Sequence, residues 1–198
     1  MRLDLRLTHR CLDQLWCQAV VAFLFEDDSL LTGHFSRLNE KLAGSLTQLI
    51  DRHFLTGKRD ELILIAPQER IKADKLLFVG LGTISSYSSE ILSGVIRNVS
   101  STLERFKLNE FGIMVQWVKE MKTDYVELIR SIICDLNDNY LLIKRDEDGF
   151  ILKIIFSIDQ KFFSDLQSLG QELRGYFDPI MEYSIAIDNS RGWVNEKV

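Results

Sequence analysis

The stretch from Asp74 to Phe106 constrains the fold of this 198-residue chain more than any other. It begins with a short apolar run, Leu76 to Val79, bounded by charged residues and glycine. Such a run predicts a strand that is buried on both faces. Gly80 and Gly82 end the strand, a serine-rich connector follows, and apolar residues then recur at helical spacing. A strand, a glycine turn and a long helix in this order predict the central unit of an α/β domain.

Further strands and helices are predicted on both sides of this unit. Strands are expected at 3–7, 19–25, 61–66 and 111–118, and helices at 38–50, 91–106 and 125–136. Leucines at 3, 5 and 7 alternate with charged residues, so the first strand should have one solvent-exposed face. Gly44 is expected to divide its helical region, and Pro67 is expected to end the strand that precedes it.

The last third of the chain predicts a different kind of pairing. Residues 140–145 and 150–156 are extended runs on either side of an Asp-Glu-Asp-Gly turn, which predicts an antiparallel hairpin. A final helix is expected from Phe162 to near Gly175, followed by an edge strand at 183–187.

The expected fold class is α/β, with a three-layer mixed sheet flanked by helices and a C-terminal antiparallel hairpin. We expect one domain over residues 1–188 and a loose polar tail at 189–198, because no boundary interrupts the alternation of elements before residue 189. A chain of this length buries roughly 70% of the surface that its unfolded form exposes, which suffices for one core.

Charge and cysteine content limit the environment and the partners. The net charge of −5 disfavours a general nucleic-acid surface. Three cysteines without framework spacing favour a reducing compartment. The start alternates charge with leucine and lacks a signal-peptide core, and the longest apolar run, 19–25, is far too short for a membrane span. The sequence therefore predicts a cytoplasmic protein without membrane contact.

Five segments in series resemble one known domain. They are Val20 to Asp28, Leu38 to Leu46, Phe54 to Lys58 with its Thr-Gly-Lys, Leu62 to Pro67, and Lys75 to Gly82 with its Leu-Leu-Phe-Val-Gly-Leu-Gly ending. The series resembles the amino-terminal domain of cytosolic leucyl aminopeptidases, the M17 family, whose fold is related to the macro domain. The resemblance is best over residues 18–118 and weak beyond 158.

The resemblance implies a non-catalytic part of an enzyme family. In that family the chemistry lies in a separate carboxy-terminal domain, where a lysine and several carboxylates hold two metal ions. Its Asn-Thr-Asp-Ala-Glu-Gly-Arg stretch has no counterpart in these 198 residues. We therefore predict no catalytic residue, no metal site, no cofactor and no enzyme activity. The family also implies a role in assembly or regulation, and in some bacterial members a contribution to DNA binding.

One loop is a candidate anion or nucleotide site. Gly80 and Gly82 would let backbone amides approach a phosphate, and Ser85 and Ser86 would add hydroxyl donors. The alternative is a tight strand exit followed by an ordinary helix entry, because the third glycine of a dinucleotide fingerprint falls near Ser85. Kinship with macro domains supports ADP-ribose binding only by analogy.

Other residues that could bind metal ions or partners have ordinary structural explanations. His9, Cys11 and Cys17 lie close together, but a tetrahedral zinc site needs a fourth ligand and a second motif is missing. The acidic stretch from Asp135 to Asp148 does not match a calcium loop. Trp193 stands in the polar tail and could dock on the domain or on a partner subunit.

Three hypotheses for the function remain open after these observations. The first is a non-catalytic module that acts through protein contacts, by self-association or by joining an aminopeptidase. The second is a macro-like binder of nucleotide or ADP-ribose at residues 80–86. The third is the N-terminal portion of a full-length metallo-aminopeptidase.

Overall fold

The computed structural model describes residues 1–28, 33–115, 117, 121, 123–159, 162, 166–189 and 192–195. Its strands are β1 (Arg2–Thr8), β2 (Ala19–Leu24), β3 (Leu62–Ile65), β4 (Lys75–Gly80), β5 (Glu110–Val115), β6 (Ile151–Ser157), β7 (Glu182–Asn189) and β8 (Gly192–Asn195). Its helices are α1 (Gly33–Lys41), α2 (Ser45–Asp51), α3 (Ser89–Arg105), α4 (Tyr125–Ile143) and α5 (Leu166–Phe177), with the short 3-10 turns η1 (Leu12–Gln14) and η2 (Ile84–Ser86).

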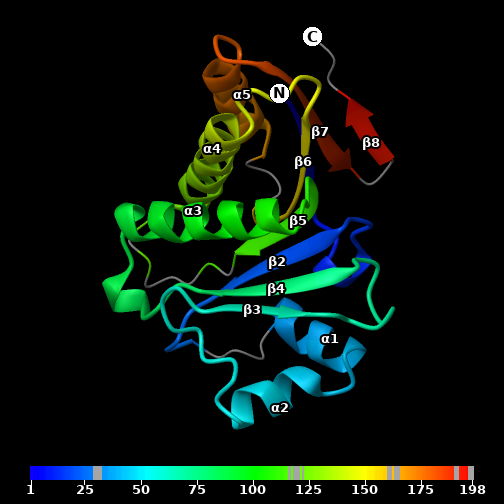
Figure 1. The fold of residues 1–198 in the computed structure, drawn as a ribbon, viewed down its shortest axis with the longest axis vertical. Coiled ribbons are helices and arrows are strands. Elements are labelled where there is room, and N and C mark those ends of the chain that lie inside the picture. Colours follow the sequence, from blue (N-terminus) through cyan, green and yellow to red (C-terminus); the bar gives the residue numbers. More distant parts are fainter. Residues whose placement is uncertain are drawn as a thin grey trace.

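The eight strands form one mixed sheet in the order β3-β4-β2-β5-β6-β1-β7-β8. The six inner strands, from β4 to β7, are all parallel, and the outer strands β3 and β8 pair antiparallel to their neighbours. Helices α3, α4 and α5 lie on one side of the sheet, and α1 and α2 lie on the other (Figure 1). The predicted three-layer α/β class with a mixed sheet is confirmed.

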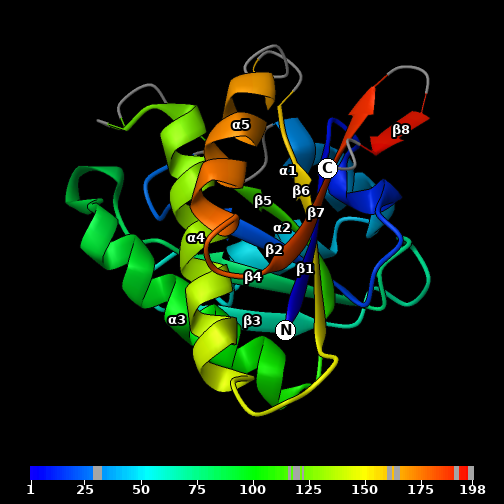
Figure 2. The ribbon, with the colours of Figure 1, turned by 90° about the horizontal axis from the view of Figure 1, so that it is seen from above.

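Two apolar clusters hold the layers together. The larger one lies between the sheet and the helices α3, α4 and α5, of which α4 lies between the other two (Figure 2). The smaller one joins the opposite face of β2 and β4 to α1 and α2. Every residue of β2 is buried, as its unbroken apolar run predicts. None of the described helices combines the length and apolar character that crossing a bilayer requires.

Local signals determine how the helices begin and end. The side chain of Ser88 accepts a hydrogen bond from the Ile91 amide and caps α3, so the helix starts several residues after the glycine turn as predicted. Gly44, at φ +78°, separates α1 from α2. The Asn39 carboxamide then accepts hydrogen bonds from the amides of Leu46 and Thr47 and secures the start of α2.

The predicted hairpin of residues 140–145 and 150–156 is wrong. Residues 140–143 form the last turn of α4, because the helical repeat of buried residues continues beyond Leu136 to Tyr140. The Asp-Gly pair does lie in a turn, with Gly149 at φ +75°, but this turn joins a helix to a strand. The strand, β6, then pairs parallel with β1 and β5.

The end of the chain differs from the prediction in three places. The final helix continues past Gly175 to Phe177. The strand predicted at 183–187 is not at the edge of the sheet, because β8 pairs beyond it. Residues 192–195 of the predicted loose tail are that strand, with Trp193 opposite Asp188 in the register.

Candidate functional site at the amino edge of the sheet

Six parallel strands begin at one edge of the sheet, which we call the amino edge. The strands are β4, β2, β5, β6, β1 and β7. Helices α3, α4 and α5 precede β5, β6 and β7 in the chain, so their C-terminal ends lie at this same edge. The amide of Arg2, at the start of β1, donates to the Phe150 carbonyl just before β6 at 2.8 Å.

Exposed apolar side chains are concentrated at the amino edge. Among the described residues, eight large apolar side chains are exposed: Trp16, Phe54, Leu64, Phe106, Leu142, Ile143, Ile151 and Ile180. Six of them lie where a strand of the amino edge begins or where its preceding helix ends, and only Phe54 and Leu64 do not. Leu142 and Trp16 are the most exposed, at 75% and 70%. Exposed apolar patches mark interaction surfaces in soluble proteins.

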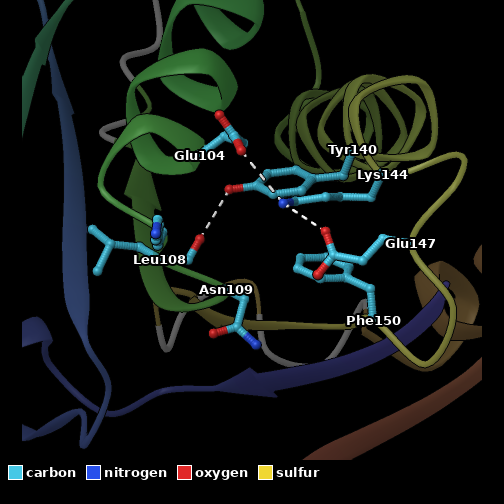
Figure 3. Close-up of a pocket in the computed structure, with 8 residues that line it drawn as sticks. Glu104, Leu108, Asn109, Tyr140, Lys144, Glu147 and Phe150 are labelled. Carbon is cyan, nitrogen blue, oxygen red and sulfur yellow. Dashed lines mark hydrogen bonds and ion pairs between the residues drawn. The ribbon is translucent and has the colours of Figure 1, made fainter.

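A pocket of about 450 Å³ opens between the ends of α3 and α4 (Figure 3). Its walls include the side chains of Glu104, Lys107, Tyr140, Lys144, Glu147 and Phe150. The pocket therefore combines two aromatic rings with two cations and two carboxylates. Such a mixed lining suits a peptide or protein side chain, because it offers apolar area and both signs of charge.

Lys144 is held between two acidic residues of this pocket. Its amine lies 3.3 Å from a carboxylate oxygen of Glu104 and 2.8 Å from one of Glu147. Figure 3 shows the amine between the two acids. It also lies 5.1 Å from the centre of the Phe150 ring, within the range of a cation–π contact. The hydrogen bond to Glu147, and then that to Glu104, raises the pKa of Lys144, so the charged form is favoured.

Tyr140 forms the buried floor of the pocket. Its ring lies nearly parallel to that of Phe150, at a centroid distance of 6.1 Å. Its hydroxyl donates to the Leu108 carbonyl oxygen at 3.1 Å (Figure 3). Burial raises the pKa of this hydroxyl, which therefore stays protonated near neutral pH. The floor is rigid and neutral, and the charged groups lie at the rim.

A second groove of about 460 Å³ lies further along the amino edge. The Trp16 ring forms one wall, and the Lys72 amine lies 4.5 Å from the ring centre. The opposite wall is the turn between β3 and β4, in which Gln68 and Glu69 both have positive φ, at +52° and +61°. Two consecutive non-glycine residues in this conformation are sterically unfavourable, and such strain is concentrated at functional sites.

The predicted anion loop lies at the opposite, carboxyl edge, where the structure brings Gly80, Gly82, Ser85 and Ser86 close together. Its amides already donate within the chain. The Gly80 amide donates to Glu61, the Gly82 amide to Gly57, and the Ser86 amide to Thr83. The Ile84 amide donates to the carboxylate of Asp27 at 2.8 Å. An anion would have to replace these bonds, and binding at this loop stays a prediction.

An occupied anion cradle lies beside that loop. The Glu61 carboxylate accepts hydrogen bonds from the amides of Thr56 and Gly57 at 2.9 and 2.8 Å, and from the Thr56 hydroxyl at 2.8 Å. In the sequence, Thr56-Gly57-Lys58 stands out only as part of the resemblance. Its structural role is to bind an internal carboxylate and to position the loop against the end of β4.

The remaining candidate residues have structural partners. Burial raises the pKa of the Cys17 thiol to about 12, which makes it a poor metal ligand or nucleophile at neutral pH. Across the described part of the chain, no group of three or more His, Cys, Asp or Glu side chains could hold a metal ion. Asp135 accepts from Ser93, and Asp138 accepts from Tyr176, so these acidic residues of α4 connect neighbouring helices.

The amino-edge residues were not identified from the sequence. Leu142 and Ile143 follow the helical apolar repeat of α4 closely enough to be mistaken for core residues or for a strand. Only the sheet order shows that the ends of three helices and the starts of six strands meet at one edge. Trp16 was the one signal in the sequence, because tryptophan is enriched at interface anchors, but the sequence does not show that its side chain is exposed.

The chain is similar in sequence to cytosol aminopeptidases. A sequence model described as "Cytosol aminopeptidase family, N-terminal domain" matches residues 20–139. A probable cytosol aminopeptidase from Sulfurihydrogenibium sp. (strain YO3AOP1) is 24% identical over 130 residues, which are 66% of this chain and 25% of the relative. This chain thus spans about a quarter of that relative's length.

Solved structures show the same fold. A Trypanosoma brucei macrodomain matches with a TM-score of 0.63 at 12% identity, over 84% of this chain and 65% of that one. A tomato leucine aminopeptidase mutant matches with a TM-score of 0.59 at 11% identity, over 78% of this chain and 32% of that one. At these identities the likeness extends to the fold alone. The predicted macro-domain-like architecture is confirmed.

Proposed function

This chain belongs to the cytosol aminopeptidase family as its N-terminal domain, and we propose that it is a non-catalytic module that docks a protein partner through the amino edge. The observation that carries the proposal is the concentration of exposed apolar side chains at that edge, among the residues that the structure describes. The partner we propose is the catalytic body of a cytosol aminopeptidase, in the same polypeptide or in a separate one.

The position of the grooves supports a protein partner over a small molecule. In open α/β sheets small ligands bind outside the carboxyl ends of the strands. Both described grooves lie at the opposite end, beside exposed side chains such as Leu142 and Trp16. Aromatic anchors with a polar rim are typical of protein interfaces. The charged rim of Glu104, Lys144 and Glu147 would then set the orientation of the partner.

The family supports the choice of partner. The curated relative is about four times as long as the segment that it shares with this chain, and its name states an aminopeptidase activity. The region that matches the family model includes α3 and most of α4, and it contains Glu104 and the 107–109 segment of the first pocket. The other lining residues, from Tyr140 to Phe150, follow directly after the matched region. The same name supports a cytoplasmic location, which we propose for this chain as well.

A binding experiment with matched variants tests the proposal. The chain is mixed with a full-length cytosol aminopeptidase, and the mass of any complex is measured by size-exclusion chromatography with light scattering. We expect a complex that the double substitution Phe106→Ser and Leu142→Ser weakens at least tenfold, by about 1.4 kcal/mol or more. The control is Phe54→Ser, because Phe54 is 62% exposed but lies away from the amino edge.

Two results would contradict the proposal. One is the absence of a complex at high micromolar concentration. The other is an equal loss of affinity in the amino-edge variant and in the Phe54→Ser control. A leucine p-nitroanilide assay with manganese is run on the chain alone, and turnover would overturn the non-catalytic part of the proposal.

A further inference from the structure

The edge strand β3 has an amino-acid composition that is unusual for a strand at the edge of a sheet. In the strand order it has one neighbour, β4, among the described strands. All four of its residues are leucine or isoleucine, and each keeps part of its surface exposed. The residues opposite them, Leu76 to Val79, are fully buried. Apolar side chains therefore reach solvent on both faces of the sheet along this edge.

The register shows which backbone groups of β3 face outward. In an antiparallel pair, residues that exchange hydrogen bonds with the neighbouring strand alternate with residues whose N–H and C=O point away. The Gly80 amide donates to the Glu61 carbonyl at 2.9 Å, and the pairing continues with Ile63 opposite Phe78. The backbone groups of Leu62 and Leu64 consequently point away from β4.

This edge lacks the usual protection against pairing. Natural edge strands carry charged residues, proline or a bulge, which prevent a further strand from adding to the sheet. None of these interrupts Leu62–Ile65, and only the short length of four residues limits the number of hydrogen bonds. The outward backbone groups and the apolar side chains together form a template for another strand.

We propose that β3 pairs with β3 of a second copy of this chain, antiparallel and centred on Leu64. An antiparallel strand pair has two-fold symmetry, so a strand whose outward residues are Leu62 and Leu64 can pair with itself. The second copy also presents leucine and isoleucine on both faces, which covers the exposed side chains of the first. A shift by one residue would place outward-facing groups opposite inward-facing ones, so the register is restricted.

The exposure of Leu64 supports this centre. Leu64 is the most exposed residue of β3, with 37% of its surface open to solvent. A pair centred on Leu64 places this side chain against its counterpart in the second copy, so the most exposed apolar group of the strand becomes covered.

The test uses a substitution that affects only the outward side of β3. Leu64→Pro removes an N–H that does not bond to β4, so the internal ladder is retained. The molar mass of wild type and variant is measured by light scattering over a concentration series, and circular dichroism verifies folding. We expect wild type to approach twice the chain mass of 23.0 kDa and the variant to remain at that mass. Leu64→Lys serves as a second variant in case proline unfolds the strand.

Leu142→Lys is the matched control, since it places the same charge at an exposed leucine of the amino edge. We expect this control to stay dimeric and the amides of Leu62 and Leu64 to exchange more slowly as concentration rises. A wild-type chain that is monomeric at about 100 µM would overturn the inference. So would a dimer that Leu142→Lys dissociates and both Leu64 variants leave intact. That second result would assign self-association to the amino edge and leave the proposed docking function standing.

Discussion

Gly80 ends β4 at a point where another segment of backbone passes at very short range. A Cβ atom built on Gly80 would lie 1.9 Å from the Lys58 carbonyl oxygen and 2.7 Å from the Gly57 carbonyl carbon. Both are main-chain atoms, so no change of rotamer can relieve the clash. The strand end or the 57–58 segment must move instead, and the hydrogen bond from the Gly80 amide to Glu61 would be strained with it.

We expect Gly80→Ala to lower the free energy of unfolding by about 2 to 4 kcal/mol. Overpacking costs about 1 to 3 kcal/mol, and the strained hydrogen bond adds about 1 kcal/mol. In a chain of this size 1 kcal/mol shifts the melting temperature by about 2 to 4 °C, so Gly80→Ala should melt at least about 4 °C below wild type.

Gly94→Ala is the matched control for this experiment. Gly94 lies inside α3, and a Cβ atom there would meet nothing within 4 Å. Alanine is favoured over glycine in a helix interior by about 0.8 to 1 kcal/mol, so this substitution should raise the melting temperature by about 2 to 4 °C. The same chemical change is thus predicted to have opposite signs at the two positions.

Thermal and urea unfolding followed by circular dichroism provide the measurement. A Gly80→Ala chain that melts within about 2 °C of wild type would refute the packing argument. If that folded variant had also lost an affinity for ADP-ribose that calorimetry detects in wild type, then Gly80 would be part of an anion cradle. The prediction therefore separates the two explanations of the glycine turn that the sequence leaves open.

Two further predictions concern buried polar groups. The carboxamide oxygen of Asn137 is fully buried on α4 and has no hydrogen-bond partner among the described residues, so Asn137→Leu should stabilise the chain by about 1 kcal/mol. A lower melting temperature in this variant would show that the carboxamide makes a bond that is not seen here. Burial raises the pKa of the Cys17 and Cys134 thiols and of the Tyr125 hydroxyl, each to about 12. The folded chain keeps these protons while the unfolded chain releases them, so stability is fully present below about pH 9 and falls as the pH rises toward 12. Melting temperatures measured between about pH 8 and pH 10.5 should fall as the pH rises, and should fall less steeply in Cys134→Ala. A melting temperature that does not change with pH over this range would contradict the prediction.

The helices and strands that the sequence predicts well are those whose type does not depend on which elements pack against them. Consecutive residues of β2 and β4 are apolar, whereas a strand with one exposed face would alternate apolar and polar residues. The apolar residues of α3 recur on a single helical face over 17 residues. Their burial and type were correct because local pattern and tertiary environment agree.

The failures arise where local pattern and tertiary environment diverge. Residues 140–143 are apolar enough for a strand, but Tyr140 faces the core as part of the repeat of α4. The turn before β6 contains the Asp-Gly pair of a hairpin, yet the parallel neighbour β1 comes from the start of the chain. The Gly80 and Gly82 amides donate hydrogen bonds to the carbonyl groups of Glu61 and Gly57. No local sequence pattern relates these positions to each other. The amino edge likewise can be recognised only once the order of the strands in the sheet is known.

The insertion of β1 between β6 and β7 has a consequence for the newly synthesised chain. Residues 2–8 leave the ribosome before their hydrogen-bonding neighbours, which are 151–157 and 182–187. The segment of 20–139 that matches the family can collapse beforehand, whereas β1 must wait for both of its flanking strands to be synthesised. Closing so large a loop is entropically slow. Completion of the sheet is therefore expected to be the last step of folding, and β1 to be the segment that chaperones meet unpaired.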